Sequence, residues 1–78
     1  MMPVKVVLDE MLARRRMSGR ELATRVNITE ANLSLLKTGK VRGIRFDTLA
    51  RICAILDCKP ADILDYEFDA ADIEIKDG

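Results

Sequence analysis

Apolar residues recur at helical spacing along most of this chain. Apolar side chains separated by three or four positions form a stripe on one face of a helix. This spacing predicts helices over residues 8–16, 19–26, 30–37 and 48–56. A fifth, very short helix is expected from Pro60, because proline suits the first helical position. The residues expected to face the core are Leu8, Met11, Leu12, Leu22, Ala23, Val26, Leu33, Leu36, Leu49, Ile52, Cys53 and Leu56.

The middle of the chain carries the clearest signals for helix starts and stops. Ser18 and Glu21 form a capping-box pattern, in which each side chain accepts a free amide at the helix start. Asn27 tolerates a left-handed backbone and should end that helix. Thr29 is a suitable N-cap for the next helix, and Gly39 should end it. Two short helices joined by a tight turn and followed by a basic loop form a helix-turn-helix arrangement.

The flanking parts of the chain complete the predicted domain. Asp47 is the expected N-cap of the fourth helix. Residues 3–7 and 64–68 have strand-like patterns and could pair within one chain or across a dimer. The sequence thus predicts an all-α domain of five helices over residues 1–68, with short extended segments at the two ends as an option. The acidic tail, residues 69–78, is expected to be partly disordered unless it pairs with another segment.

Charge is distributed unevenly along the chain. The whole sequence has 13 Lys and Arg against 13 Asp and Glu, a net charge of zero. Residues 1–58 hold 11 basic and 6 acidic residues, a net charge of +5, whereas residues 59–78 hold 2 and 7, a net charge of −5. A basic domain with an acidic tail keeps a local positive field that the total charge conceals.

The composition argues against most catalytic and metal-binding schemes. The chain has no His, two Cys and only 4% aromatic residues. Cys53 and Cys58 are separated by four residues and have no further ligands nearby in sequence, so the spacing gives no zinc signature. Cys53 is predicted to be a small buried hydrophobe and Cys58 to lie in the following turn, without a disulfide. We therefore expect no enzyme, metal or cofactor, and a cytoplasmic location in the absence of a membrane or export segment.

Several stretches of the chain resemble the phage repressor and Cro type of helix-turn-helix domain, also called the XRE family. The later stretches are similar to its small single-domain bacterial members. The family usually has Gly where this chain has Asn27, a residue that tolerates the same backbone. The resemblance spans residues 8–66 and implies a five-helix, repressor-like fold that binds double-stranded DNA. The stretches that carry it are Met17–Ala23, Val26–Thr29, Leu33–Lys40, Arg45–Leu49 and Leu56–Leu64.

The resemblance places the third helix in the major groove of DNA, with its first turn and the next facing base edges. Glu30 suits a cytosine amino group, and Ala31 or Leu35 suits a thymine methyl group. The family often has Gln or Arg in place of Glu30 and Ala31, so the sequence preference stays open. Glu30 is equally well explained by the dipole at a helix start. The expected base contacts are Thr29, Glu30, Ala31, Asn32, Ser34 and Leu35.

Residues that flank this helix are the expected phosphate contacts. The loop 37–45 has four basic residues, no acid and two glycines, although it could serve solubility alone. Arg45 matches a family position that reaches the DNA backbone or minor groove. The arginines at 14–16 could either stabilise a helix end through its dipole or supply one more phosphate contact. The expected set is Ser18, Arg20, Lys37, Lys40, Arg42 and Arg45.

These observations predict a sequence-specific DNA-binding transcriptional regulator, with repression as the expected effect. One small domain contacts few base pairs, so a homodimer on a pseudo-palindrome is expected. Its candidate interface residues are Val4, Val6, Tyr66 and Phe68. Two alternatives stay open: an antitoxin that binds a partner toxin through residues 65–78, and a protein-interaction module that has lost DNA binding.

Overall fold

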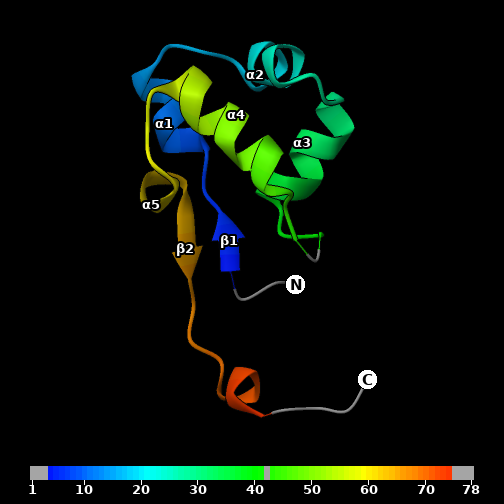
Figure 1. Cartoon of the computed structure of the whole chain (residues 1–78), viewed down its shortest axis with the longest axis vertical. Coiled ribbons are helices and arrows are strands. Elements are labelled where there is room, and N and C mark those ends of the chain that lie inside the picture. The colour runs from blue at the N-terminus through cyan, green and yellow to red at the C-terminus, as the bar shows by residue number, and fades with distance from the viewer. Residues whose placement is uncertain (1–3, 42, 75–78) are drawn as a thin grey trace.

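The computed structural model describes residues 4–41 and 43–74 of the chain (Figure 1). It confirms the five predicted helices. Helix α2 (Gly19–Val26) packs against both α3 (Glu30–Lys37) and α4 (Phe46–Leu56), and α4 also contacts the short α5 (Pro60–Ile63). The elements in chain order are β1 (Val4–Val6), α1 (Asp9–Arg14), α2 (Gly19–Val26), α3 (Glu30–Lys37), α4 (Phe46–Leu56), α5 (Pro60–Ile63), β2 (Leu64–Tyr66) and the 3₁₀ helix η1 (Ala70–Ile73).

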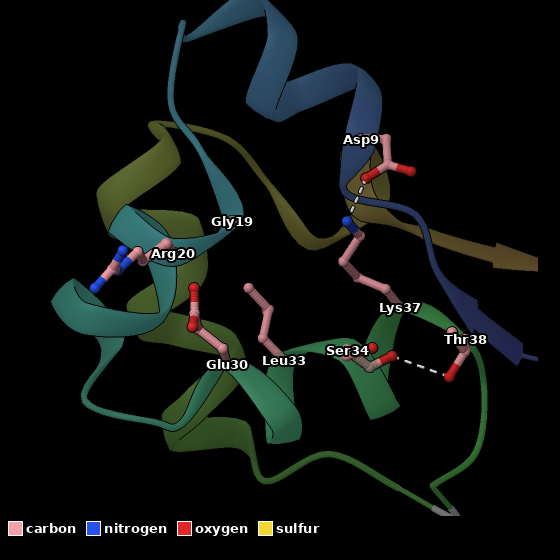
Figure 2. Close-up of a pocket in the computed structure, with 8 residues that line it drawn as sticks. All are labelled: Asp9, Gly19, Arg20, Glu30, Leu33, Ser34, Lys37 and Thr38. Atoms are coloured by element: carbon pink, nitrogen blue, oxygen red, sulfur yellow. Dashed lines mark hydrogen bonds and ion pairs between the residues drawn. The ribbon is translucent and has the colours of Figure 1, made fainter.

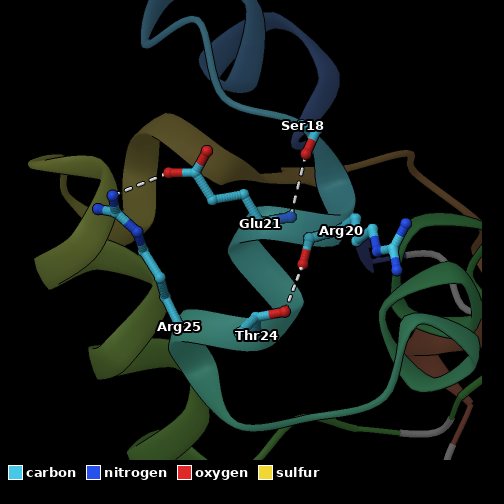
Figure 3. Close-up of polar contacts among 5 residues, drawn as sticks. All are labelled: Ser18, Arg20, Glu21, Thr24 and Arg25. Atoms are coloured by element: carbon cyan, nitrogen blue, oxygen red, sulfur yellow. Dashed lines mark hydrogen bonds and ion pairs between the residues drawn. The ribbon is translucent and has the colours of Figure 1, made fainter.

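The predicted N-caps of α2 and α3 are both present. The Ser18 hydroxyl accepts the backbone N–H of Glu21 at 3.0 Å, and the Thr29 hydroxyl accepts that of Asn32 at 3.0 Å. Only half of the predicted capping box forms, because within the described residues the Glu21 carboxylate pairs with Arg25 at 2.8 Å instead of the Ser18 amide (Figure 3). One capped amide at each helix start is enough to set where the two helices begin.

Left-handed residues follow the ends of four helices. Asn27 has a φ of 65° after α2, and Gly39 has a φ of 73° after α3, as predicted. Asp57, with a φ of 50°, ends α4 in the same way. Helix α1 stops at Arg14, two residues earlier than predicted, and Arg16 lies beyond it with a φ of 52°. A long cationic side chain in this conformation is unusual, because its Cβ crowds the following carbonyl.

The start of α4 differs from the prediction. The helix begins at Phe46, and Arg45 is the N-cap residue, with an extended backbone and no side-chain capping bond. The predicted cap, Asp47, therefore lies inside the first turn. Its negative charge still interacts favourably with the positive end of the helix dipole, but its side chain accepts no N-cap hydrogen bond.

The core is aliphatic and draws on every helix from α1 to α5. The predicted core residue Cys53 is half-buried and packs against the cluster from its edge. Val6 in β1 is buried in the core, and so is Ile63 in the short α5, as expected from its apolar side chain. The buried residues are Val6, Leu8, Met11, Leu12, Leu22, Ala23, Val26, Leu33, Leu36, Leu49, Ile52, Leu56 and Ile63.

The two ends of the domain pair with each other in a small antiparallel sheet. Val4 lies opposite Tyr66, and Val6 lies opposite Leu64. The fold is therefore not purely all-α, and the strand-like segments pair within one chain. Burial of Val6, at 5% exposure, excludes this residue from the predicted dimer interface in the folded domain. Val4, Tyr66 and Phe68 are exposed.

The acidic tail is partly folded. Residues 70–73 form the helix η1, which lies away from the helical body at the end of an extended segment (Figure 1). The Asp69 carboxylate caps it by accepting the N–H of Ala71 at 2.9 Å. The Tyr66 hydroxyl donates to the Asp72 carboxylate at 3.0 Å. These contacts give residues 69–74 local structure, and residues 75–78, for which partial disorder stays a prediction, lie outside the described part.

Arg15, the middle of the three consecutive arginines at 14–16, links the end of α1 to the end of α4. Arg15 donates from Nε to the backbone carbonyl of Leu56 at 2.7 Å, and from Nη2 to that of Asp57 at 3.0 Å. Those carbonyls lie at the end of α4, where backbone acceptors lack helical partners. Its neighbour Arg14 pairs with Glu10 on its own helix at 2.7 Å. Arg14 and Arg15 are thus engaged at helix ends, and a phosphate contact by one of the three arginines stays a prediction.

Candidate nucleic-acid interface

Helix α3 buries one side in the core and exposes the other, and this exposed side forms a ridge on the surface. Leu33 and Leu36 point into the core, which fixes the rotation of the helix about its axis. Leu35 is 40% exposed and adds an apolar side chain to the outer face of the helix. The six residues expected to contact bases are all exposed: Thr29, Glu30, Ala31, Asn32, Ser34 and Leu35.

A hollow of about 420 Å³ lies on one side of the ridge (Figure 2). It separates α3 from the start of α2 and the start of α1. Two expected phosphate contacts, Arg20 and Lys37, line it together with two expected base contacts, Glu30 and Ser34. The structure thus brings together residues that are up to 17 positions apart in sequence, from Arg20 to Lys37.

A second, smaller hollow of about 180 Å³ lies on the other side of α3. Asn32 lines it from α3, and Arg45 lines it from the start of α4. Gly43 leaves space here, since nothing lies within 4 Å of where its Cβ would be. Ser18 and Lys40 line neither of these two hollows. Arg42, another expected phosphate contact, lies outside the described residues.

The start of α2 presents an arginine beside free backbone amides. The Arg20 side chain projects away from the helix, on the side that faces α3 (Figure 3). The Thr24 hydroxyl donates to the Arg20 backbone carbonyl at 3.0 Å, one turn back in the same helix. In the described part of the chain, Arg20, Lys40 and Arg45 form no ion pair. Three of the expected phosphate contacts therefore keep their full positive charge available.

Lys37 differs from those three. Its ammonium nitrogen lies 2.6 Å from a carboxylate oxygen of Asp9, the first residue of α1. Sequence reasoning did not find this pair, since no local pattern joins positions 28 residues apart. It also missed Phe46, which is 85% exposed and follows Arg45 at the start of α4.

The two cysteines offer no site of their own. Both are free and half-buried, and the backbone N–H of Cys58 donates to the carbonyl of Cys53 at 3.0 Å. Burial, and secondly the adjacent Cys53, raise the pKa of the Cys58 thiol to about 11. A thiol with this pKa stays protonated at neutral pH and is a poor nucleophile or metal ligand. Within residues 4–41 and 43–74, no group of three or more His, Cys, Asp or Glu side chains is arranged to hold a metal ion.

No helix in the described ranges has the length and apolar character needed to cross a membrane.

Comparisons with known proteins agree with the helix-turn-helix fold. The chain is 53% identical over 68 residues to a protein of Bacillus subtilis (strain 168), the uncharacterized HTH-type transcriptional regulator YozG, covering 87% of this chain and 81% of that protein. Its fold is similar to the crystal structure of the transcriptional regulator VanUg, with a TM-score of 0.66, 24% identity, and coverage of 88% and 93% of the two chains. The family model for Cro/C1-type HTH DNA-binding domains matches residues 7–69. The chain belongs to this family of Cro/C1-type helix-turn-helix DNA-binding domains.

Proposed function

We propose that this protein is a sequence-specific regulator of transcription that inserts α3 into the major groove of DNA. The observation that carries the proposal is the exposed ridge of α3 between two hollows, each lined by an arginine. A helix in the major groove has a sugar-phosphate strand on either side. Arg20 on one side and Arg45 on the other are therefore placed to meet the two strands.

Base recognition is assigned to the exposed face of α3. Glu30 accepts from a cytosine amino group, and Ser34 bonds a base edge as donor or acceptor. Ala31 and Leu35 favour a thymine methyl group, because both present apolar atoms to the groove. The Thr29 hydroxyl accepts an amide at the helix start, so its proton remains free for an acceptor on DNA. Asn32 borders the second hollow and adds amide groups to the same face.

The positioning contacts are assigned to the residues around α3. Ser18, Lys40 and Arg42 join Arg20, Lys37 and Arg45 in this proposed set. Contacts of this kind hold the protein on the phosphates and make binding depend strongly on salt. They supply affinity for any duplex, whereas the side chains of α3 select the sequence.

The phosphate assignment is tested by a pair of charge-matched variants. Arg45→Ala should weaken binding to every duplex and reduce the slope of log K against log salt by about 1. Lys59→Ala removes the same charge at the start of α5, which lies away from α3 (Figure 1), and should leave the slope unchanged. Fluorescence anisotropy across a salt series measures both. Absence of wild-type binding at low salt would refute the proposed function.

The assignment of base contacts is tested by selecting bound duplexes from a random pool. Ser34→Ala should change the preferred base at one position of the selected sequence and leave the salt slope intact. Selection of no shared sequence by the wild-type protein would show that α3 does not recognise bases.

We further propose that the active form is a two-fold dimer that represses by occupying a pseudo-palindromic operator. The support is an exposed apolar set at one end of the domain, formed by Val4, Tyr66 and Phe68. Sedimentation at micromolar concentration should detect the dimer, and Phe68→Ser should weaken it. A strict monomer in the presence of its operator would contradict this assembly. The known relatives do not favour the alternatives of an antitoxin or an interaction module.

A further inference from the structure

One expected DNA contact is already engaged within the protein. Lys37 is the last residue of α3, and its side chain extends across the hollow toward α1 (Figure 2). There its Nζ atom lies 2.6 Å from Oδ1 of Asp9. The same hollow is lined by Arg20 and Ser34, which are assigned to a phosphate and a base. A DNA strand that enters this hollow therefore meets an ammonium group that already has an anionic partner.

We propose that Asp9 sets the DNA affinity of this surface by competing with a DNA phosphate for Lys37. This proposal rests on the proposed function, because it takes Lys37 as a phosphate contact. The Asp9 side chain is 81% exposed, so its carboxylate also repels an approaching phosphate directly. An ammonium group bonded to a carboxylate must give up that bond, or share it, before it neutralises a phosphate. Asp9 thereby lowers affinity for all DNA sequences alike.

A purely structural role explains the pair less well. Exposed ion pairs contribute little to folding, because water solvates both ends and salt screens the attraction. Helix α1 is also held to the rest of the domain without this pair, through Met11 and Leu12 in the core. Arg15 ties the end of the same helix to α4. Loss of the Asp9 carboxylate should therefore leave the fold intact.

The chain provides a matched control in the next residue. Asp9 and Glu10 are both acidic residues in the first turn of α1, and both interact favourably with the positive end of its dipole. Glu10 pairs with Arg14 on its own helix at 2.7 Å and, within the described residues, forms no ion pair with α3. Asp9→Asn and Glu10→Gln therefore remove the same charge from adjacent positions, and only the first frees Lys37.

The experiment measures binding of wild-type protein and both variants to a labelled duplex of mixed sequence by anisotropy, between about 50 and 200 mM salt. We expect Asp9→Asn to bind roughly two- to fivefold more tightly, the range set by the strength of exposed ion pairs. Its salt slope should steepen by about 0.9, the value for one added phosphate contact. Glu10→Gln should match the wild type. In a Lys37→Ala background, Asp9→Asn should gain at most a small part of this increase.

Different outcomes separate this proposal from the function on which it rests. Equal affinities for Asp9→Asn and Glu10→Gln, with the wild type binding normally, would overturn the competition and leave the proposed function standing. Weaker binding by Asp9→Asn would also overturn it, because Asp9 would then hold Lys37 in position for DNA. An increase that persists without Lys37 would assign the effect to charge alone. Absence of wild-type binding would refute both proposals together.

Discussion

Arg15 offers the sharpest test of how this fold is held together. Its guanidinium donates to two backbone carbonyls at the end of α4, on Leu56 and Asp57, across 41 and 42 positions of sequence. The carbonyl of Leu56 accepts at 2.7 Å in partly buried surroundings. Arg15→Ala removes both donors and leaves these acceptors to water or to no partner. We expect this substitution to destabilise the domain and leave the proposed DNA-binding surface unchanged.

The magnitude follows from the two bonds. A hydrogen bond to a charged group contributes about 1.5–3 kcal/mol when shielded, and less at an exposed site. The bond to Leu56 is partly buried, whereas the bond to Asp57 is exposed, so we assign most of the effect to the first. A cation at the end of a helix adds about 0.3–1 kcal/mol. Together these give a loss of about 2 kcal/mol, which corresponds to a drop in Tm of roughly 10 °C for a domain of this size.

Urea denaturation followed by circular dichroism measures the loss, because the chain has no Trp to report by fluorescence. Arg14→Ala is the control, since it removes an equal charge from an exposed i,i+4 pair and should cost about 0.3–0.5 kcal/mol. Equal losses for Arg14→Ala and Arg15→Ala would refute the role assigned to the two carbonyl bonds. If Arg15→Ala lost DNA affinity while fully folded, Arg15 would instead be one of the phosphate contacts.

Three further predictions follow from the backbone, the core and the thiols. Arg16→Gly should stabilise the domain by about 0.5–1 kcal/mol, because glycine removes the left-handed strain at this position. Arg14→Gly, inside α1, should destabilise the domain by about as much. Shifts of the urea midpoint in the same direction for both variants would contradict this. Ile52→Ala should cost about 2–5 kcal/mol because the side chain is fully buried, and a loss under about 1 kcal/mol in urea would show a looser core. The raised pKa of Cys58 should slow its alkylation near pH 9 by roughly tenfold or more relative to the urea-unfolded chain, as measured by mass spectrometry. The same shift should reduce stability as pH rises from about 9 toward 11, since the unfolded chain releases the Cys58 proton first.

The sequence by itself determined the elements whose signals are local. Ser18, Thr29, Asn27 and Gly39 mark helix ends, because a cap or a left-handed residue acts on amides and carbonyls within four positions. The apolar spacing gave the buried faces of the helices, since one stripe must face the core whatever the neighbour is. The exposed residues of α3 followed from the same periodicity. Asp47 shows the limit of such signals, because helix α4 begins two residues earlier than its cap pattern indicated.

Only the tertiary structure decided which distant groups meet. Strand β1 pairs with β2 of the same chain, and Val6 is buried there. The sequence could not give this result, because an alternating pattern predicts a strand without specifying which strand it pairs with. The bonds of Arg15 to the end of α4, and of Lys37 to Asp9, depend on how three helices pack. Charged side chains carry no periodicity that names a partner 28 or 41 positions away. The packing of the apolar faces sets these distances, and the polar contacts form where that packing brings opposite charges or free carbonyls together.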